Sequence, residues 1–116
     1  FHAASTKSIE LCRNREPQFM YEIQVFRIGD MAIISLPGEP FVEGQLEIKT
    51  RSPAKLTFIA HMSTQYIGYL PTSDACTRPG HETSAQCTYW AKFAPDSLAR
   101  IVDATMAMLT ALFEND

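Results

Sequence analysis

The feature that most constrains the fold of this chain is a run of six residues, Met31 to Leu36, that is apolar on both of its faces. Before it, residues 21–28 alternate between apolar and polar side chains, as a half-buried strand does. Gly29-Asp30 joins the two runs, and because glycine accepts a positive φ, this dipeptide predicts a hairpin turn. A strand with two apolar faces belongs in the centre of a sheet that is covered on both sides. We therefore expect the sheet to continue in a segment outside these 116 residues.

Two helices and one further strand are expected after the hairpin. Proline suits the first helical position, where a missing N–H costs nothing, so Pro40 predicts a helix over residues 40–50. Its expected buried residues are Phe41, Val42, Leu46 and Ile48. The run 56–60 predicts a third strand. A second helix should begin at Pro95 and bury one apolar side, formed by Leu98, Ile101, Val102, Thr105, Leu109, Leu112 and Phe113.

The remaining segments carry weaker patterns. Residues 1–20 have mixed charge and no clear period, so we expect a lead-in with at most a helical turn. Residues 61–94 form a long irregular stretch, and such stretches in compact domains are usually functional or disordered. The order of elements predicts a mixed α/β (α+β) fold: β-hairpin, helix, strand, long loop and C-terminal helix. We expect residues 1–116 to be a single segment, a two-layer piece of a larger mixed-sheet domain.

Composition narrows the classes of partner. The chain is 46% apolar and 20% charged, as is usual for a soluble globular protein. Its net charge of −3 gives no reason to expect nucleic acid or an anionic membrane surface as a partner. No apolar run approaches the roughly 18 residues that a membrane span requires. Because the chain begins with Phe1 rather than Met, we expect a processed chain or a segment of a longer protein.

A few polar residues lie where chemistry is expected. Glu39 comes between an expected strand and an expected helix, and ligands usually bind beyond the carboxyl ends of strands. Tyr69 lies in the irregular stretch, where a phenolate can ligate a metal, although packing is the commoner role of a tyrosine. His81, followed by Glu82, is a candidate acid, base or ligand. For Glu39 the plain alternative is a solvated side chain, and for His61 it is a partly buried polar residue.

The order and spacing of these residues resemble the neutral/alkaline (non-lysosomal) ceramidase family and its bacterial ceramidase-like relatives. Leu36-Pro37-Gly38-Glu39 resembles the family's "PGE" turn, and Tyr66-x-x-Tyr69-x-Pro71-Thr72 follows about thirty residues later. His81-Glu82 falls where the family has a Tyr-Glu pair, twelve residues after the second tyrosine. The resemblance runs from about residue 21 to residue 113, and it implies the C-terminal part of the catalytic domain.

The resemblance implies roles for three residues. Glu39 and Tyr69 would be ligands of a catalytic zinc, and His81 would lie near the substrate and the reaction centre. Two residues depart from the family pattern: Thr64 stands in place of an Asn, and His81 in place of the second functional Tyr. An imidazole is shorter than a phenol, so the substrate could differ from ceramide. The family's zinc-binding histidines and nucleophilic serine lie upstream of the matched region, so this segment alone is expected to be inactive.

The function implied is that of a zinc-dependent amidohydrolase of sphingolipid type, which cleaves an N-acyl bond in a small-molecule or lipid-like substrate. The upstream part of the same polypeptide, or a companion chain, would supply the missing zinc ligands. One alternative is a non-catalytic ceramidase-like module that binds a partner or a lipid-like ligand. Another is a separate site in which His61 and His81 join Glu39.

The cysteines bear on the compartment. The resemblance implies a secreted or periplasmic protein, and a disulfide between Cys76 and Cys87 would fit an oxidising compartment. Three unpaired thiols, the third being Cys12, would leave a cytoplasmic location open.

Overall fold

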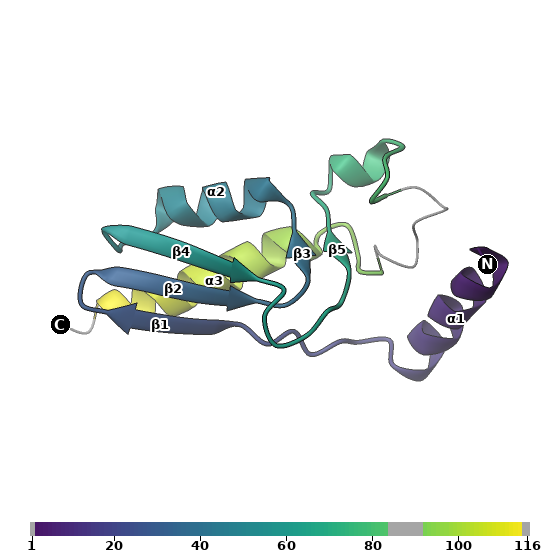
Figure 1. Cartoon of the computed structure of the whole chain (residues 1–116), viewed down its shortest axis with the longest axis horizontal. Helices are drawn as coiled ribbons and strands as arrows, with labels where there is room; N and C mark the ends of the chain where they lie inside the picture. Colours follow the sequence, from purple (N-terminus) through teal and green to yellow (C-terminus); the bar gives the residue numbers. More distant parts are fainter. Residues whose placement is uncertain (1, 84–91, 115–116) are drawn as a thin grey trace.

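Three strands form the main sheet in the computed structural model, which describes residues 2–83 and 92–114 (Figure 1). Strands β1 (Gln24–Ile28) and β2 (Met31–Leu36) form an antiparallel hairpin, and its turn contains Gly29 with a φ of 59°. Strand β4 (Leu56–His61) pairs with β2 in parallel, so β2 lies between the other two. The central position predicted from the two apolar faces of β2 is therefore confirmed, as is the mixed α/β class.

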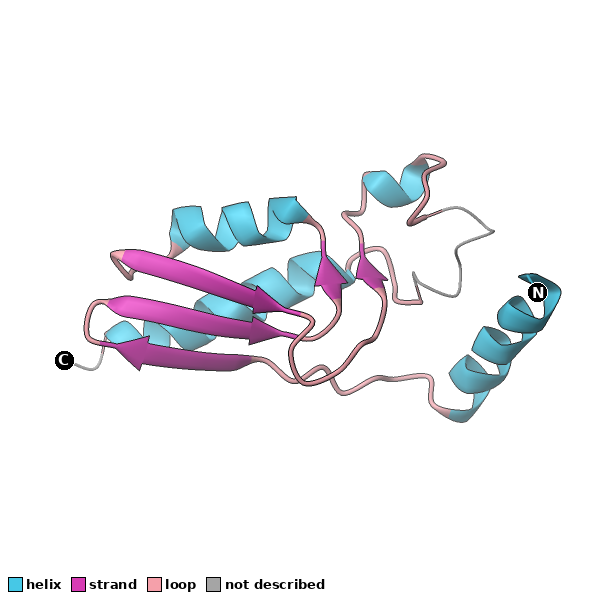
Figure 2. Cartoon of the chain, viewed as in Figure 1, coloured by secondary structure: helices cyan, strands magenta, loops and turns pink. Residues whose placement is uncertain are grey.

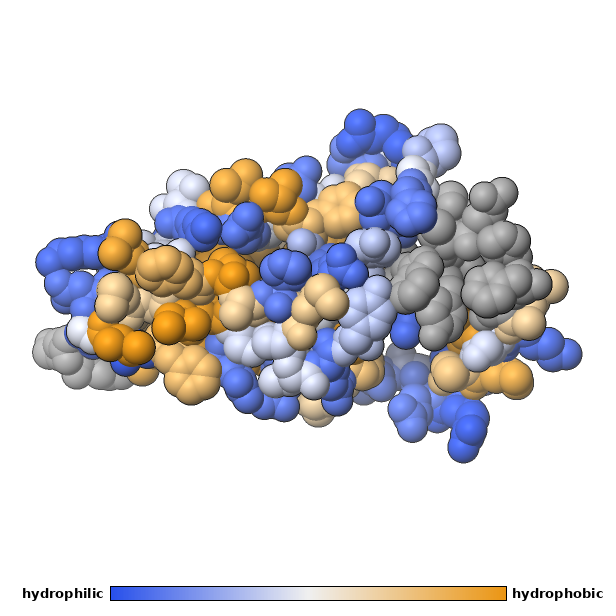
Figure 3. All heavy atoms as spheres, in the orientation of Figure 1, coloured by the Kyte–Doolittle hydropathy of each residue, from blue (hydrophilic) through white to orange (hydrophobic). Residues whose placement is uncertain are grey.

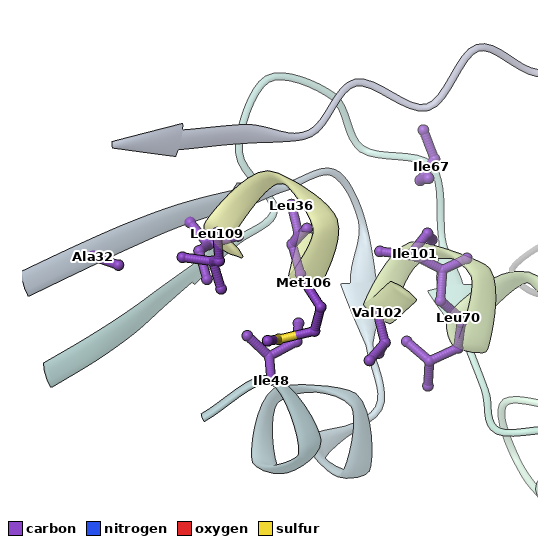
Figure 4. Packing of buried hydrophobic residues seen from close by; sticks show 11 residues of the cluster. Ala32, Leu36, Ile48, Ile67, Leu70, Ile101, Val102, Met106 and Leu109 are labelled. Carbon is purple, nitrogen blue, oxygen red and sulfur yellow. The ribbon is translucent and has the colours of Figure 1, made fainter. Parts of the chain in front are cut away.

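Two helices cover one face of this sheet: α2 (Val42–Arg51) and α3 (Ser97–Phe113) (Figure 2). The side chains of Ile34, Leu36, Ile48 and Leu109 are almost fully buried between the two layers. Met106 of α3 reaches toward Ile48 of α2 (Figure 4). Burial of an aliphatic side chain of this size contributes about 1.5–3 kcal/mol, so this layer supplies the main apolar stabilisation of the fold.

The opposite face of the sheet is uncovered by any described residue. The register places two rows of apolar side chains on it, Phe26–Ile33–Phe58 and Ile28–Met31–Leu56. Five of the six are substantially exposed, and Phe26, Ile28, Leu56 and Phe58 each expose more than half of their surface. In Figure 3 apolar side chains gather over this part of the molecule. We call these six residues the open sheet face.

The start of α2 differs from the prediction. Pro40 is not the first helical residue, because Glu39–Pro40 forms a short strand, β3, and the helix begins at Val42. Strand β3 pairs in parallel with a second short strand, β5 (Tyr69–Leu70). The backbone N–H groups on either side of Pro40 donate to this neighbour. Pro40 has no N–H, which suits a ladder position where its own donor is not needed.

The buried side of α2 also differs from the prediction. Val42 and Leu46 were expected to be buried, but their side chains are 54% and 55% exposed, while Ile48 is buried as predicted and Phe41 is half-buried. The helix instead turns Gly44 toward α3. A Cβ on Gly44 would lie 2.8 Å from the Cδ1 of Leu98, so the absence of a side chain allows the two helices to approach closely.

The N-terminal segment contains more helix than predicted. Helix α1 (His2–Arg15) spans 14 residues, and Ile9 is its one buried residue among those whose side chains are described. An exposed helix of mixed charge leaves almost no apolar period in the sequence, which explains why the pattern was missed.

The long loop and the last helix also differ in detail. Besides β5, the loop contains a short 3-10 helix, η1 (Ala75–Thr77). Helix α3 begins at Ser97 rather than at Pro95, and it buries Met106 but leaves Leu112 37% exposed. Among the described helices, none has the length and apolarity needed to cross a bilayer.

Candidate functional site

The turn that carries Glu39 is held in place by close backbone packing. Strand β2 ends at Leu36, Pro37 is buried, and Gly38 adopts a φ of 71°. A Cβ on Gly38 would lie 2.6 Å from the Cγ1 of Ile67 and 2.7 Å from the carbonyl oxygen of Gly68. Only glycine combines this φ with this approach, so the segment before β5 rests directly on the turn.

Four backbone hydrogen bonds fix the two segments together. The N–H groups of Gly38, Glu39 and Phe41 donate to carbonyl oxygens of the segment that contains β5, at 3.0, 2.9 and 3.0 Å. The N–H of Met62 donates in return to the carbonyl oxygen of Gly38 at 2.8 Å. Backbone bonds of this kind depend little on side chains. The relative position of β3 and β5 is therefore a property of the fold rather than of exposed loops.

The register of this ladder makes Glu39 and Tyr69 direct neighbours. The two residues are 30 positions apart in the sequence, yet they occupy paired positions on adjacent strands. Adjacent strands lie about 4.7–4.9 Å apart, and paired residues project to the same side of a sheet. The carboxylate and the phenol are thus both presented at the end of the main sheet.

The third predicted residue lies beside them. The rings of Tyr69 and His81 meet edge to face, with 6.4 Å between their centroids and 73° between their planes. Glu39 and Tyr69 are half-buried and His81 is exposed, so the group lies at the surface. The fold therefore brings together Glu39, Tyr69 and His81, and we call them the Glu39–Tyr69–His81 group.

The side chains of this group are chemically suited to a zinc ion. A carboxylate oxygen, a phenolate oxygen and an imidazole nitrogen are all donors that bind a divalent metal. Within the described part of the chain, the Glu39 carboxylate forms no hydrogen bond or ion pair, so it is available to a cation. Residues 2–83 and 92–114 contain no group of three His, Cys, Asp or Glu side chains that could hold a metal. The described residues therefore give no support to the alternative site in which His61 and His81 join Glu39.

Two further contacts, for which the sequence gave no sign, hold the turn before Glu39 in place. The hydroxyl of Tyr21 donates to the carbonyl oxygen of Pro37, and burial raises the pKa of this phenol. The hydroxyl groups of Ser35 and Ser63 lie 2.6 Å apart, which ties β2 to the loop after β4. Tyr21 begins the alternating run that predicted the first strand, and the pattern gave no signal that its hydroxyl would be buried.

The predicted cysteine pair falls partly outside the described residues. Among the described residues, neither Cys12 nor Cys76 forms a disulfide, and the first is exposed while the second is half-buried. Cys87, the expected partner of Cys76, lies outside the residues that the structure describes, so this pair stays a prediction.

Comparison with known proteins gives no relative from which a role could be transferred. No protein-family model, no curated protein and no solved structure matches this chain. The geometry of the Glu39–Tyr69–His81 group is therefore the main basis for a functional proposal.

Proposed function

We propose that this chain is part of a zinc-dependent hydrolase that cleaves an N-acyl amide bond, and that it supplies Glu39 and Tyr69 to the metal. The observation that carries the proposal is the pairing of Glu39 with Tyr69 and the contact of Tyr69 with His81. These three residues were selected from the sequence by their chemistry and by their resemblance to the ceramidase pattern, without knowledge of the fold. Their proximity in the fold is what a shared site requires.

A second observation supports the same alignment. Thr64, which stands where the ceramidase family has an Asn, adopts a φ of 62°. Asn is several-fold enriched in this left-handed region, whereas a β-branched residue is rare there. The backbone at this position thus has a conformation that suits the residue of the family pattern.

Each residue has a distinct role in the proposed chemistry. Glu39 and Tyr69 bind the metal through oxygen, and zinc, when bound, polarises the amide carbonyl and lowers the pKa of a bound water. In this proposal His81 donates a hydrogen bond to the oxygen on which negative charge develops. Catalytic zinc sites usually have three protein ligands, and this chain supplies two. The remaining ligands come from an upstream segment or a companion chain.

The open sheet face supports the need for such a companion. Contiguous apolar patches of more than a few hundred Å² are rare on monomeric proteins and usually mark contact surfaces. The six residues of the open sheet face form two complete cross-strand rows. A segment packed on them would restore the two-sided burial that β2 predicts. The same face favours the second candidate function, a non-catalytic module that binds a partner or a lipid-like ligand.

Zinc binding by the 116-residue chain tests the half-site directly. We expect weak binding of one zinc per chain in competition with a chromophoric chelator. Glu39→Gln and Tyr69→Phe should each reduce the affinity about tenfold or more, because each removes a direct ligand. Glu43→Gln is the matched control, since Glu43 is an exposed carboxylate in the first turn of α2. Equal affinity in all four proteins would show that the two residues do not bind zinc.

Activity in the full-length protein tests the reaction. Zinc content by elemental analysis and hydrolysis of an N-acyl amide should both fall in Glu39→Gln and be retained in Glu43→Gln. A full-length protein that contains no zinc, and that hydrolyses the amide equally well with Gln at position 39, would exclude this function. It would leave the non-catalytic module as the better candidate.

A further inference from the structure

A pocket of about 550 Å³ lies between the segment leading into β1, the N-terminal half of α3 and residue Leu70 of β5. Its lining includes Phe19, Tyr21, Leu70, Phe93, Arg100 and Ile101. None of the Glu39–Tyr69–His81 group is among these residues. The volume is within the range of about 300–1,000 Å³ that is typical of small-molecule sites.

The apolar wall of this pocket includes three aromatic residues, Phe19, Tyr21 and Phe93. The rings of Phe19 and Phe93 meet edge to face at a centroid distance of 5.4 Å. The Tyr21 hydroxyl is already bonded to Pro37, so this residue presents its ring to the pocket. Leu70 and Ile101, both buried, add aliphatic surface. This lining suits the apolar body of a ligand and leaves few polar groups to orient it.

The basic and the acidic side chain of the pocket differ in whether they already have an ion-pair partner. The Arg100 guanidinium forms no hydrogen bond or ion pair within the described part of the chain. Asp103, the acidic residue of the lining, is paired with Arg51 at 3.2 Å. The Ser97 hydroxyl lies in the same lining and is a further donor. The pocket thus combines an apolar wall with one available cation and one hydroxyl.

We propose that this pocket binds an amphiphilic carboxylate, whose apolar chain contacts the aromatic wall and whose carboxylate binds Arg100. A guanidinium binds a carboxylate through two parallel N–H donors, which adds orientation to the charge attraction. A neutral apolar ligand would leave Arg100 unused, and a cation would be placed next to it. This inference does not depend on zinc or on the proposed hydrolase activity.

Calorimetric titration with straight-chain carboxylates below their micelle concentrations tests the ligand class. We expect saturable binding of one hexanoate, octanoate or decanoate per chain, with the affinity rising by up to about fourfold per added methylene. Octanol should bind about tenfold more weakly than octanoate, because it lacks the charge-assisted bond. Absence of saturable binding, or equal affinity for octanol and octanoate, would overturn the proposal.

Two variants test the position of the carboxylate. Arg100→Gln should reduce the affinity for octanoate about tenfold and leave that for octanol unchanged. Lys49→Gln, which removes an exposed cation of α2 away from the pocket lining, should change neither. The unfolding midpoint of Arg100→Gln should match that of the unmodified chain, since Arg100 has no described partner to lose. An unchanged octanoate affinity in Arg100→Gln would refute the assignment.

Chemical shifts of the aromatic side chains distinguish this pocket from the open sheet face. Octanoate should shift the resonances of Phe19 and Phe93, which belong to the pocket wall. Shifts confined to Phe26 and Phe58 would place the ligand on the open sheet face instead, and would contradict the proposal.

Discussion

The hydroxyl of Tyr21 donates a hydrogen bond of 2.7 Å to the carbonyl oxygen of Pro37. This bond connects the segment that precedes β1 to the turn that carries Glu39. The ring of the same tyrosine lines the aromatic pocket beside α3. One side chain therefore links the turn before Glu39 to the pocket, and because burial raises the pKa of its phenol, its contribution to stability should depend on pH.

Tyr21→Phe tests this pH dependence. At pH 7 we expect the variant to be about 1 kcal/mol less stable, the usual contribution of one hydrogen bond. Burial raises the pKa of Tyr21 above the ordinary value of 10.0, so above pH 10 the unfolded chain releases this proton while the folded chain retains it. The unfolded state of the unmodified protein is then favoured as the pH rises.

The variant lacks this proton, so the stability difference between the two proteins should shrink between pH 8 and pH 11. Urea unfolding across this range measures it. A difference that stays constant would show that Tyr21 ionises equally in both states.

Gly38→Ala tests whether close packing holds the β3–β5 ladder. We expect a loss of about 3 kcal/mol or more, because an L-residue is strained at a φ of 71° and the new Cβ would collide with Ile67 and with the Gly68 carbonyl. Gly29→Ala is the matched control. Its φ is 59°, but nothing lies within 4 Å of the added Cβ, so only the backbone strain of about 1–2 kcal/mol applies. Similar losses in chemical denaturation would mean that contact with the segment before β5 contributes nothing.

Thr64→Asn should stabilise the fold. Thr64 is exposed and adopts a φ of 62°, a conformation that a β-branched side chain disfavours and Asn tolerates. We expect a gain of about 0.5–1 kcal/mol in the free energy of unfolding. Thr64→Val keeps the branch and replaces the hydroxyl with a methyl group, so it should give no gain. If the Asn and Val variants unfold at the same denaturant concentration, backbone strain is not the cause.

The main sheet and its central strand could be predicted because their signals are local. Gly29-Asp30 specifies the hairpin turn, and the two apolar faces of the run 31–36 specify a central strand. The last helix was predicted nearly to its ends because its apolar period repeats over four turns. Helix α1 was missed because an exposed helix needs no such period. Val42 and Leu46 were misassigned because Gly44, which has no side chain to enter a hydrophobic pattern, determines which side of α2 faces α3.

That the candidate site is shared was predicted only from the resemblance. Glu39, Tyr69 and His81 were chosen by their resemblance to a family pattern, and nothing in their spacing says that they would meet. The aromatic pocket was not foreseen, since Phe19 comes from a segment that is far in the sequence from Phe93 and Arg100. Tyr21 likewise gave an alternating strand pattern that contained no sign of its bond to Pro37.

The sequence by itself determined the β1–β2 hairpin, strand β4, helices α2 and α3, and the central place of β2. Those properties follow from the period of apolar side chains and from the dihedral freedom of glycine, which act over a few residues. The tertiary structure alone decided that β3 pairs with β5, which makes Glu39 a neighbour of Tyr69. That pairing depends on a close approach at Gly38 between segments about 30 residues apart, and such an approach is set by packing rather than by local pattern.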